Sequence, residues 1–464
     1  MSKTSGREQA IHAATQTIHN GQFFDTLARR VAMQTESQNP DAAAQLSAYL
    51  TDEMAPLFVS LGFATEFYPN PVDGKPPLMI AERIEAEALP TLLLYGHGDV
   101  TNGQAELWQA GTHPWQLTQS GNQLFGRGTA DNKGQHTINL MALQAVLDAR
   151  GGKLGYNVKI LFEMSEEVGS TGLEQFCREQ KDKLAADLFL ASDGPRLNAG
   201  TPTLFLGSRG VCQFRLRSHT GNGDRHSGNW GGIITNSAIR LQHALATLVS
   251  ANGRILAEPL KAPQPEGLTA SMMQQLPVGG QAGDPELNPH WGESHLTDGE
   301  RLFGSNTLEV IALGAGNIAQ PIGAIPQTAE AVCHLRMVPG TDWQNLIPNL
   351  SAYLAAAGFE DIEVILEGGY NATRLDPNHP WVGFARESMQ RSLQQEITVL
   401  PNLGGTIPNH CFAEVLELPT VWMPHSYPSC KQHAPDEHLL VDVAEQGLAA
   451  AAGLLWDLGD KWPA

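Results

Sequence analysis

Residues 91–100, TLLLYGHGDV, are a short apolar run that ends in polar side chains. The same pattern returns at 158–167, VKILFEMSEE, and at 186–195, ADLFLASDGP. Between the first two runs lies 136–151, HTINLMALQAVLDARG, whose apolar residues recur with helical spacing. Short apolar strands that alternate with helices are typical of a mainly parallel sheet covered on both faces. The sequence therefore predicts an α/β fold with its functional site at the carboxyl ends of these strands.

The pattern changes after residue 206. The segment 211–219, VCQFRLRSH, alternates with period two, and a helical pattern follows it at 236–250. Further strands are predicted at 306–314, 329–340 and 362–369, a helix is predicted at 343–358, and a Pro/Gly-rich stretch runs from 262 to 293. This order of elements is typical of an α+β domain.

The chain of 464 residues is long for one domain, so two are expected. After Tyr370 the pattern returns to that of the first part. We predict one domain of residues 1–206 and 374–464, interrupted by an inserted α+β domain of residues 207–373.

Composition narrows the classes of partner. Hydrophobic residues make up 42% and charged residues 17%, a balance typical of soluble proteins. The net charge of −20 argues against nucleic acid and anionic membranes as partners. The first residues contain no apolar signal region, and the apolar run 448–456 is predicted to be a buried helix. Five scattered cysteines without a CxxC pair indicate reduced thiols and a cytoplasmic protein.

Imidazole and carboxylate side chains gather at the predicted strand ends. His97 and Asp99 are two residues apart and would share one face of an extended segment. Each of these residues alone could belong to a solvated surface turn. Together, five separate segments of the chain each supply a side chain of a metal-ligand type. These are His97, Asp131, one of Glu166 and Glu167, Asp193 and His433. This set predicts two divalent ions roughly 3.5–4 Å apart. Zn²⁺ is favoured, with Mn²⁺ and Co²⁺ as alternatives.

Eight motifs in a fixed order connect these residues to a known family. The motifs are GHGD, GRGTADNKG, EMSEEVGSTG, SDGP, HSGNWGG, RMVPG, GGTIP and HAPDE. In this order the chain resembles the M20 metallopeptidases, and in particular their carnosinase-like dipeptidase branch. The resemblance implies a zinc-peptidase catalytic domain interrupted by a smaller lid domain that also forms a homodimer.

The resemblance also implies a role for each site residue. Asp131 would bridge two metal ions, the first held also by His97 and Asp193 and the second also by Glu167 and His433. Asp99 would orient His97. Glu166 would be the general base, which takes a proton from the attacking water and delivers it to the leaving nitrogen.

Three further residues are implied to contact the substrate. His226 in HSGNWGG would reach the active site of the partner subunit, where it would help to stabilise the oxyanion. Arg336 in RMVPG would hold a substrate carboxylate by a bidentate contact. Thr406 in GGTIP, with neighbouring backbone amides, would contact the same end of the substrate.

One departure from the family bears on the substrate. Carnosinase-like dipeptidases usually carry Arg-Glu before this Gly-Gly, and the glutamate can bind the free amine of the substrate. This chain has Asn402 and Leu403 there, so that carboxylate is missing. Asp193, in contrast, is the residue usual in the aminopeptidases and dipeptidases of the family. We therefore expect an exopeptidase acting on dipeptides or similar small peptides, with an amidohydrolase of N-acyl amino acids as the alternative.

Other classes fit the sequence less well. A two-metal phosphoesterase would share the cation chemistry, but the chain has no evident phosphate-binding loop and no GxxxxGK[ST]. HExxH and GxSxG are also absent, which argues against mononuclear zinc proteases and serine hydrolases. An inactive scaffold would be expected to have lost Glu166 or a ligand, and every position is present. Cys430 is interpreted as an unligated thiol.

Overall fold

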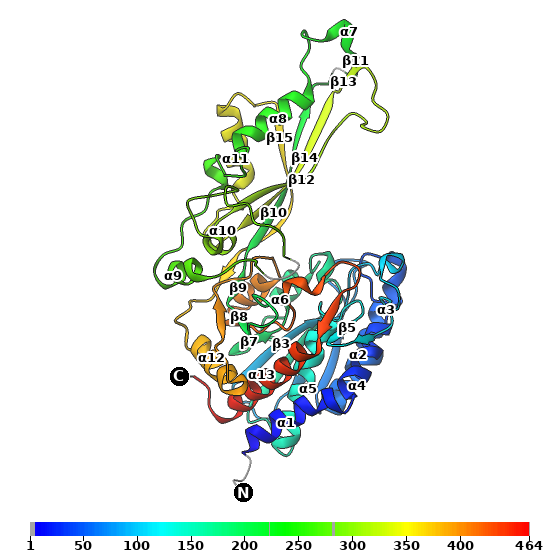
Figure 1. Cartoon of the computed structure of the whole chain (residues 1–464), viewed down its shortest axis with the longest axis vertical. Coiled ribbons are helices and arrows are strands. Elements are labelled where there is room, and N and C mark those ends of the chain that lie inside the picture. Colours follow the sequence, from blue (N-terminus) through cyan, green and yellow to red (C-terminus); the bar gives the residue numbers. More distant parts are fainter. Residues whose placement is uncertain (1–4, 222, 281–283, 464) are drawn as a thin grey trace.

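The computed structural model describes residues 5–221, 223–280 and 284–463. Within these ranges the two largest sheets have eight and four strands (Figure 1). The strands of the larger sheet are β1 (Ala64–Tyr68), β2 (Leu78–Arg83), β3 (Thr91–His97), β6 (Asn157–Glu163), β7 (Leu188–Ala191), β8 (Thr203–Phe205), β17 (Thr398–Leu400) and β18 (Thr420–Trp422). Their spatial order is β1-β2-β6-β3-β7-β18-β8-β17.

The middle of the larger sheet is parallel. Strand β3 pairs in parallel with β6 on one side and with β7 on the other, and β7 pairs in parallel with β18. The carboxyl ends of β3, β6 and β7 therefore lie next to one another. The prediction of an α/β fold with a mainly parallel central sheet is confirmed, with antiparallel strands at the β1-β2 edge.

Helices cover both faces of this sheet because alternate strand residues point to opposite sides. On one face Leu92 and Leu94 belong to a core shared with the buried helix α13. The helices of this face are α1 (Gly6–His19), α2 (Gln22–Ala32), α5 (Lys133–Ala149), α12 (Pro380–Leu393) and α13 (Val441–Asp460). On the other face Leu93 and Tyr95 pack in a core that includes residues of α6 (Leu173–Glu179). As predicted, residues 448–456 lie in a buried helix.

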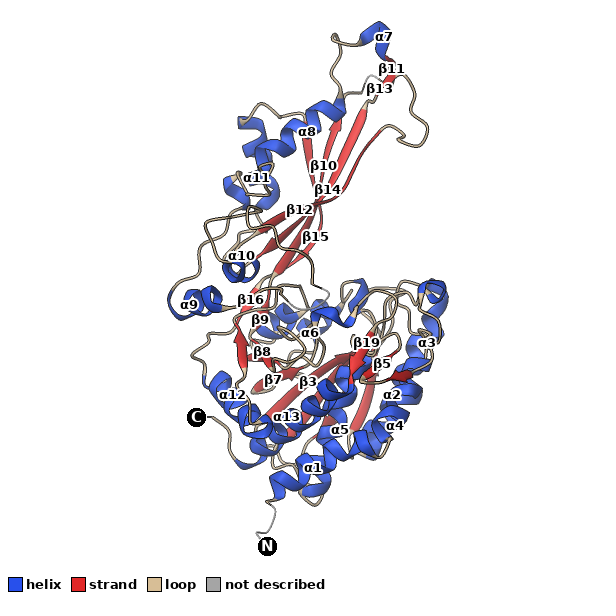
Figure 2. Ribbon diagram, in the orientation of Figure 1, coloured by secondary structure: helices blue, strands red, loops and turns tan. Residues whose placement is uncertain are grey.

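The smaller sheet is antiparallel, with the order β12-β14-β10-β15. Its strands are β10 (Gly210–His219), β12 (Thr307–Ala315), β14 (Thr328–Met337) and β15 (Ile362–Tyr370). Figure 2 shows α8 (Ser237–Leu248) and α11 (Leu346–Ala356) on one side of it. The strict alternation of buried and less buried residues along β10 and β14 follows from this one-sided covering. Arginine and glutamate side chains pair across the uncovered face, as Arg215 and Arg217 do with Glu330.

The chain crosses between the two large sheets at two adjacent places. Strand β9 (Gly207–Ser208) pairs with β16 (Thr373–Arg374), and both lie between the sheets in Figure 1. After β16 the chain adds β17 and β18 to the larger sheet. The exact domain limits at 206/207 and 373/374 remain a prediction. We call the part from β10 to β15 the lid.

Several smaller elements complete the described part. The far end of the lid carries β11 (Arg225–His226), α7 (Ser227–Trp230) and β13 (Ala324–Ile325) (Figure 1). The lid also contains α9 (Gly267–Gln275) and α10 (Asp298–Gly304), and α9 lies within the Pro/Gly-rich stretch, for which no element was predicted from the sequence. The remaining α-helices and strands of the described residues are α3 (Ala43–Ala48), α4 (Ala55–Ser60), β4 (Thr118–Ser120), β5 (Gln123–Phe125) and β19 (His438–Leu440). In the described residues no helix combines the length and the apolar character needed to cross a membrane.

Candidate metal centre

Two groups of potential metal ligands share one aspartate. His97, Asp131 and Asp193 form the first group, and Asp131, Glu167 and His433 form the second. Within each group the ligand atoms all lie within 4.8 Å of one another. The five residues predicted as ligands from the sequence are thus brought together, in the two sets that were predicted.

The parallel sheet explains how these residues meet. His97 is the last residue of β3, Glu167 follows β6 by four residues, and Asp193 follows β7 by two. These three strands are neighbours, so the side chains that follow them emerge at one edge of the sheet. Asp131 lies in the loop before α5, and His433 lies in the loop before β19.

His97 is fully buried and is held from both ring nitrogens. Its Nδ1 lies 3.1 Å from the main-chain oxygen of Asp99 and 3.3 Å from Asp99 Oδ1. A proton on Nδ1 would satisfy these acceptors and leave Nε2 to coordinate a metal. Nε2 points to the carboxylates, 3.2 Å from Asp131 Oδ1 and 3.6 Å from Asp193 Oδ2. Asp99 therefore contacts the ring nitrogen that faces away from the other ligands, as the predicted orienting role requires.

Asp99 has a second contact with the site. Its carboxylate accepts hydrogen bonds from the backbone N–H groups of Glu166 and Glu167, each at 3.1 Å. The same side chain thus positions His97 and the turn that carries both glutamates.

The two carboxylate oxygens of Asp131 face different histidines. Oδ1 faces His97, and Oδ2 lies 3.2 Å from His433 Nε2. His433 Nε2 is also 2.9 Å from Glu167 Oε2. A carboxylate with one oxygen directed to each ligand group has the arrangement of a bridging ligand. The His433 side chain is 57% exposed, so the second group is the one that is open to solvent.

Electrostatics favour cations at this position. Burial, with the neighbouring Asp131 charge, raises the pKa of Glu167 to about 8 and also raises that of Asp193. Burial has the same effect on the pKa of Glu166, which lies well above its usual range. Burial also acts on Asp131, but hydrogen bonds from His433 and His97 outweigh it and lower the Asp131 pKa.

The donor set fits two divalent ions. Among the described residues no lysine or arginine forms an ion pair with Asp131, Asp193 or Glu167. Asp193 Oδ2 is buried without a hydrogen-bond partner, as expected for an atom intended for a metal. Carboxylate oxygens together with imidazole nitrogens suit Zn²⁺, Mn²⁺ and Co²⁺.

Glu166 belongs to neither ligand group. It is only partly exposed and lies close enough to His97, Asp193, Glu167 and Asp131 for their charges to act on its pKa. A carboxylate beside the metal ligands but outside both groups has the position that a general base requires.

Two buried glutamates support the site, although the sequence analysis gave them no role. Glu437 is 1% exposed, and its Oε1 accepts from the backbone N–H groups of Ala130 at 2.9 Å and Asp131 at 3.0 Å. Its other oxygen pairs with the buried Arg127 at 2.8 Å. Glu437 lies in the HAPDE motif, so the motif contained the signal. Glu163 ends β6 and accepts from the hydroxyl groups of Ser165 and Ser170.

Of the three residues predicted to contact the substrate, Arg336 and Thr406 lie together, whereas His226 lies far from them. Arg336 of β14 donates to Thr406 Oγ1 at 2.8 Å, so these two lie together where the lid meets the larger sheet. His226 lies in β11 and is exposed, and β11 is at the far end of the lid, away from β3 and β7 of the larger sheet (Figure 1). One chain therefore does not bring His226 to its own metal ligands.

Leu403 is 6% exposed and packs against Gly194, next to Asp193.

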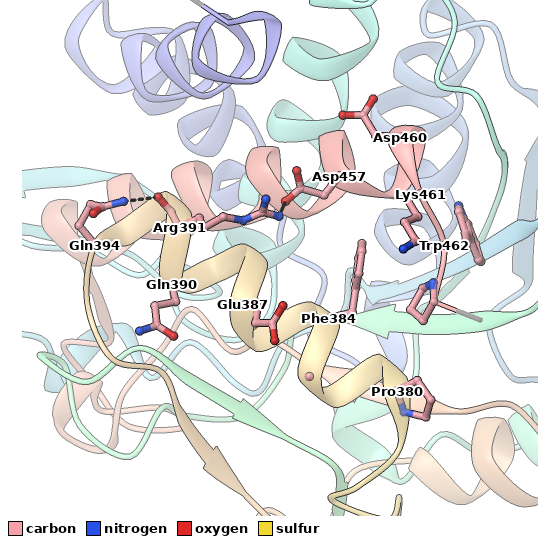
Figure 3. A pocket seen from close by; sticks show the side chains of 12 residues that line it. Pro380, Phe384, Glu387, Gln390, Arg391, Gln394, Asp457, Asp460, Lys461 and Trp462 are labelled. Atoms are coloured by element: carbon pink, nitrogen blue, oxygen red, sulfur yellow. Dashed lines mark hydrogen bonds and ion pairs between the residues drawn. The ribbon is translucent and has the colours of Figure 1, made fainter.

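A cavity of about 860 Å³ lies away from the metal ligands, between α12 and α13 (Figure 3). It is lined by Phe384, Arg391, Asp457 and Trp462, among others, and by none of the predicted site residues. Asp457 pairs with Arg391 on the cavity wall and with Arg7. These pairs hold three helices together, so a structural role accounts for them.

The chain is similar to several known proteins. The family model "Peptidase family M20/M25/M40" matches residues 93–457. Beta-Ala-His dipeptidase of Mus musculus is 32% identical over 254 residues, which are 52% of this chain and 50% of the relative. Cysteinylglycine-S-conjugate dipeptidase of Corynebacterium striatum is 28% identical over 336 residues, 69% of this chain and 70% of the relative.

A solved structure shows the same fold. Human carnosine dipeptidase 1 superposes with a TM-score of 0.79 at 21% identity, covering 97% of this chain and 99% of the other. The sequence match, in contrast, spans only about half the length of the Beta-Ala-His dipeptidases of mouse and Rattus norvegicus.

Proposed function

Since this chain belongs to peptidase family M20/M25/M40, we propose that it is a metal-dependent hydrolase that cleaves dipeptides. The observation that carries the proposal is the pair of ligand groups joined through Asp131, with the unligated Glu166 beside them. Two such ligand groups could hold divalent ions that bind both the attacking water and the amide carbonyl, with Glu166 near enough to accept the proton of the water.

The mechanism assigns a task to each side chain. When bound, two divalent ions would acidify the attacking water and polarise the substrate carbonyl. Glu166 accepts the proton of that water and transfers it to the amide nitrogen as the C–N bond breaks. Asp99 fixes the orientation of His97 and the position of the Glu166 backbone. Glu167, Asp193, His97, His433 and Asp131 would hold the ions.

The preference for dipeptides rests on the lid contact and on the relatives. Arg336 and Thr406 lie together, and a guanidinium group beside a hydroxyl suits the carboxylate at the end of a short peptide. The named relatives act on Beta-Ala-His and on cysteinylglycine S-conjugates. N-acyl amino acids share the carboxylate and the amide, so they serve as the comparison substrates.

In a homodimer, His226 of one subunit could reach the metal site of the other. Strand β12 is an edge strand of the lid sheet, and three of its apolar side chains are exposed: Val310 by 40%, Ile311 by 52% and Leu313 by 53%. Pairing of such edges between two copies would cover these residues. In this arrangement His226 of one subunit would serve the metal site of its partner.

Two further proposals concern organisation and location. Residues 207–373, which include the lid, would form the lid/dimerisation domain, and the remaining residues the catalytic domain. This is supported by the paired crossings at β9 and β16. A cytoplasmic location is supported by the cysteines, all five of which lie in the described residues and are free.

The test is a substrate screen on metal-free protein. Dipeptides and N-acetyl amino acids are each offered with Zn²⁺, Mn²⁺ or Co²⁺ added back. We expect dipeptide hydrolysis that requires a divalent ion and stops with a chelator. Activity that persists in the chelator, or hydrolysis of N-acetyl amino acids alone, would contradict the proposal.

A further inference from the structure

The turn at residues 165–170 carries both Glu166 and Glu167, and its inner side is anchored to the end of β6. Glu163 accepts from Ser165 Oγ at 3.1 Å and from Ser170 Oγ at 2.8 Å. The turn is also closed by its own backbone, because the N–H groups of Gly169 and Ser170 donate to the carbonyls of Glu166 and Ser165, both at 2.8 Å. These contacts all come from the larger sheet and the turn itself.

The outer side of the turn is held by the lid. The hydroxyl of Tyr370 donates to the carbonyl oxygen of Gly169. The approach is close, since a Cβ on Gly169 would lie 2.8 Å from the Tyr370 hydroxyl oxygen, and Gly169 also has a φ of +85°. The Tyr370 ring packs on His410, with the ring centroids 5.1 Å apart. Burial raises the pKa of Tyr370 to about 12, so the hydroxyl keeps the proton that it donates.

The position of Tyr370 is set by the lid sheet. Tyr370 is the last residue of β15, and it pairs with Val211 at the start of β10. The next residue, Asn371, accepts from Trp343 Nε1 of the lid and donates to Glu414. Tyr370 thus lies where the chain leaves the lid, and its side chain reaches back to the turn that carries Glu166.

We propose that Tyr370 is a positioning residue that fixes Glu166 relative to the lid. Arg336, which we assign to the substrate carboxylate, lies on β14 of the same sheet, so the hydroxyl links the group that would bind substrate to the group that would accept the proton. Without this link the turn is still held on its inner side by Glu163 and Asp99, but its outer side loses its contact with the lid and can shift against the substrate. The proposal rests on the proposed function for its kinetic part only.

Tyr370→Phe removes the hydroxyl and keeps the ring. We expect kcat for a dipeptide to fall by about 10- to 100-fold, because a displacement of the order of 1 Å at a reacting group has that effect. KM should stay within about twofold, since Arg336 and Thr406 are unchanged. Metal content should equal that of the wild type, because all five ligands are retained.

Tyr353→Phe is the matched control. Tyr353 of α11 also donates its hydroxyl to a backbone carbonyl, that of Thr247 at 2.9 Å, but this bond lies wholly within the lid. Both variants lose one bond of the same kind, so a general loss of stability would affect them alike. We expect Tyr353→Phe to retain wild-type kcat. Equal losses of kcat in both variants, or a loss of metal in Tyr370→Phe, would overturn the positioning role.

A measurement without substrate separates this proposal from the proposed function. Amide hydrogen exchange of the metal-loaded enzyme reports on the N–H groups of Val168, Gly169 and Ser170, which close the turn. We expect their exchange to be at least about fivefold faster in Tyr370→Phe and unchanged in Tyr353→Phe. Unchanged exchange in both variants would overturn the link to the turn. If the wild type hydrolyses no dipeptide, the exchange result alone decides the proposal.

Discussion

At the scale of single residues, neighbouring side chains take different positions around the metal centre. Glu166 and Glu167 share the acceptor Asp99 through their backbone N–H groups. Only the Glu167 carboxylate joins a ligand group, in contact with His433. Glu166 stays outside both groups, and this separates the proposed base from the proposed ligand.

Glu166→Gln should therefore retain the metal ions while kcat falls by about 10²–10⁴-fold, the usual effect of removing a general base. The amide keeps the shape of the side chain but accepts no proton from water. Glu167→Ala is the contrasting variant, and it should bind less metal. Metal analysis and kinetics of both purified proteins check the assignment, which near-normal turnover of Glu166→Gln would refute.

Leu403 leads to a second prediction at this scale. It is buried against Gly194, so its position offers no carboxylate for a substrate amine. An N-acetylated dipeptide should then have a kcat/KM within about tenfold of the free dipeptide, roughly 1.4 kcal/mol. Paired kinetics on one dipeptide and its N-acetyl form give the ratio. Complete loss of turnover on acetylation would mean that another group binds the amine.

At the scale of elements, the loop before α5 depends on a contact with the segment before β19. Glu437 accepts from the N–H groups of Gly128, Ala130 and Asp131, and it forms a buried ion pair with Arg127. Both partners of the pair are 1% exposed at the side chain. Removing one partner of a buried pair leaves the other charge without compensation.

Glu437→Ala should lower the free energy of unfolding by about 3–5 kcal/mol. Urea denaturation of the metal-free protein measures this effect apart from metal binding. Glu417→Ala is the control, because Glu417 pairs with Lys181 on the surface. The control should leave the unfolding midpoint unchanged, and equal shifts in the two variants would argue against a special role for Glu437.

At the scale of the whole molecule, β11, which carries His226, lies at the far end of the lid, away from the larger sheet whose strand ends carry the metal ligands (Figure 1). The exposed apolar residues of β12 lie in the same lid. A second copy that pairs with this edge would remove the apolar surface from water and supply His226 in trans. The active site would then require two chains.

Mixing subunits tests the shared site. His226→Ala and Glu166→Gln proteins, each nearly inactive alone, are combined under conditions that allow exchange. Activity should recover to about a quarter of wild type, because half of the dimers are mixed and each has one intact site of two. Mass analysis verifies the exchange. A mixture that exchanges but stays inactive would show that His226 does not act in the partner subunit.

The dimer edge can be tested separately. Leu313→Lys places a charge on β12 and should give a monomer at concentrations where the wild type is a dimer. Leu366→Lys is matched to it, since Leu366 is 45% exposed on β15, the other edge of the same sheet. Light scattering should show a dimer for this control. Dissociation by Leu366→Lys instead would move the interface to β15.

The sequence by itself determined the elements and the ligand types. Apolar runs that end in histidine or carboxylate predicted β3, β6 and β7, because a strand in the middle of a parallel sheet is covered on both faces and is therefore mostly apolar, with polar residues gathering towards its end. Ordered motifs then predicted the five ligands, which the structure brings together. The helix α9 escaped prediction because its short segment lies among prolines and glycines.

Only the tertiary structure decided the contacts between distant segments. Glu437 meets the backbone of Asp131 across 306 residues, and Tyr370 meets Gly169 across 201. The orientation of the two Asp131 oxygens and the distance of His226 from its own metal ligands are decided in the same way. Local preference and periodicity act over a few residues, whereas these contacts depend on tertiary packing. Glu437 meets Asp131 outside the lid, and Tyr370 meets Gly169 where the lid packs against the part that contains the larger sheet.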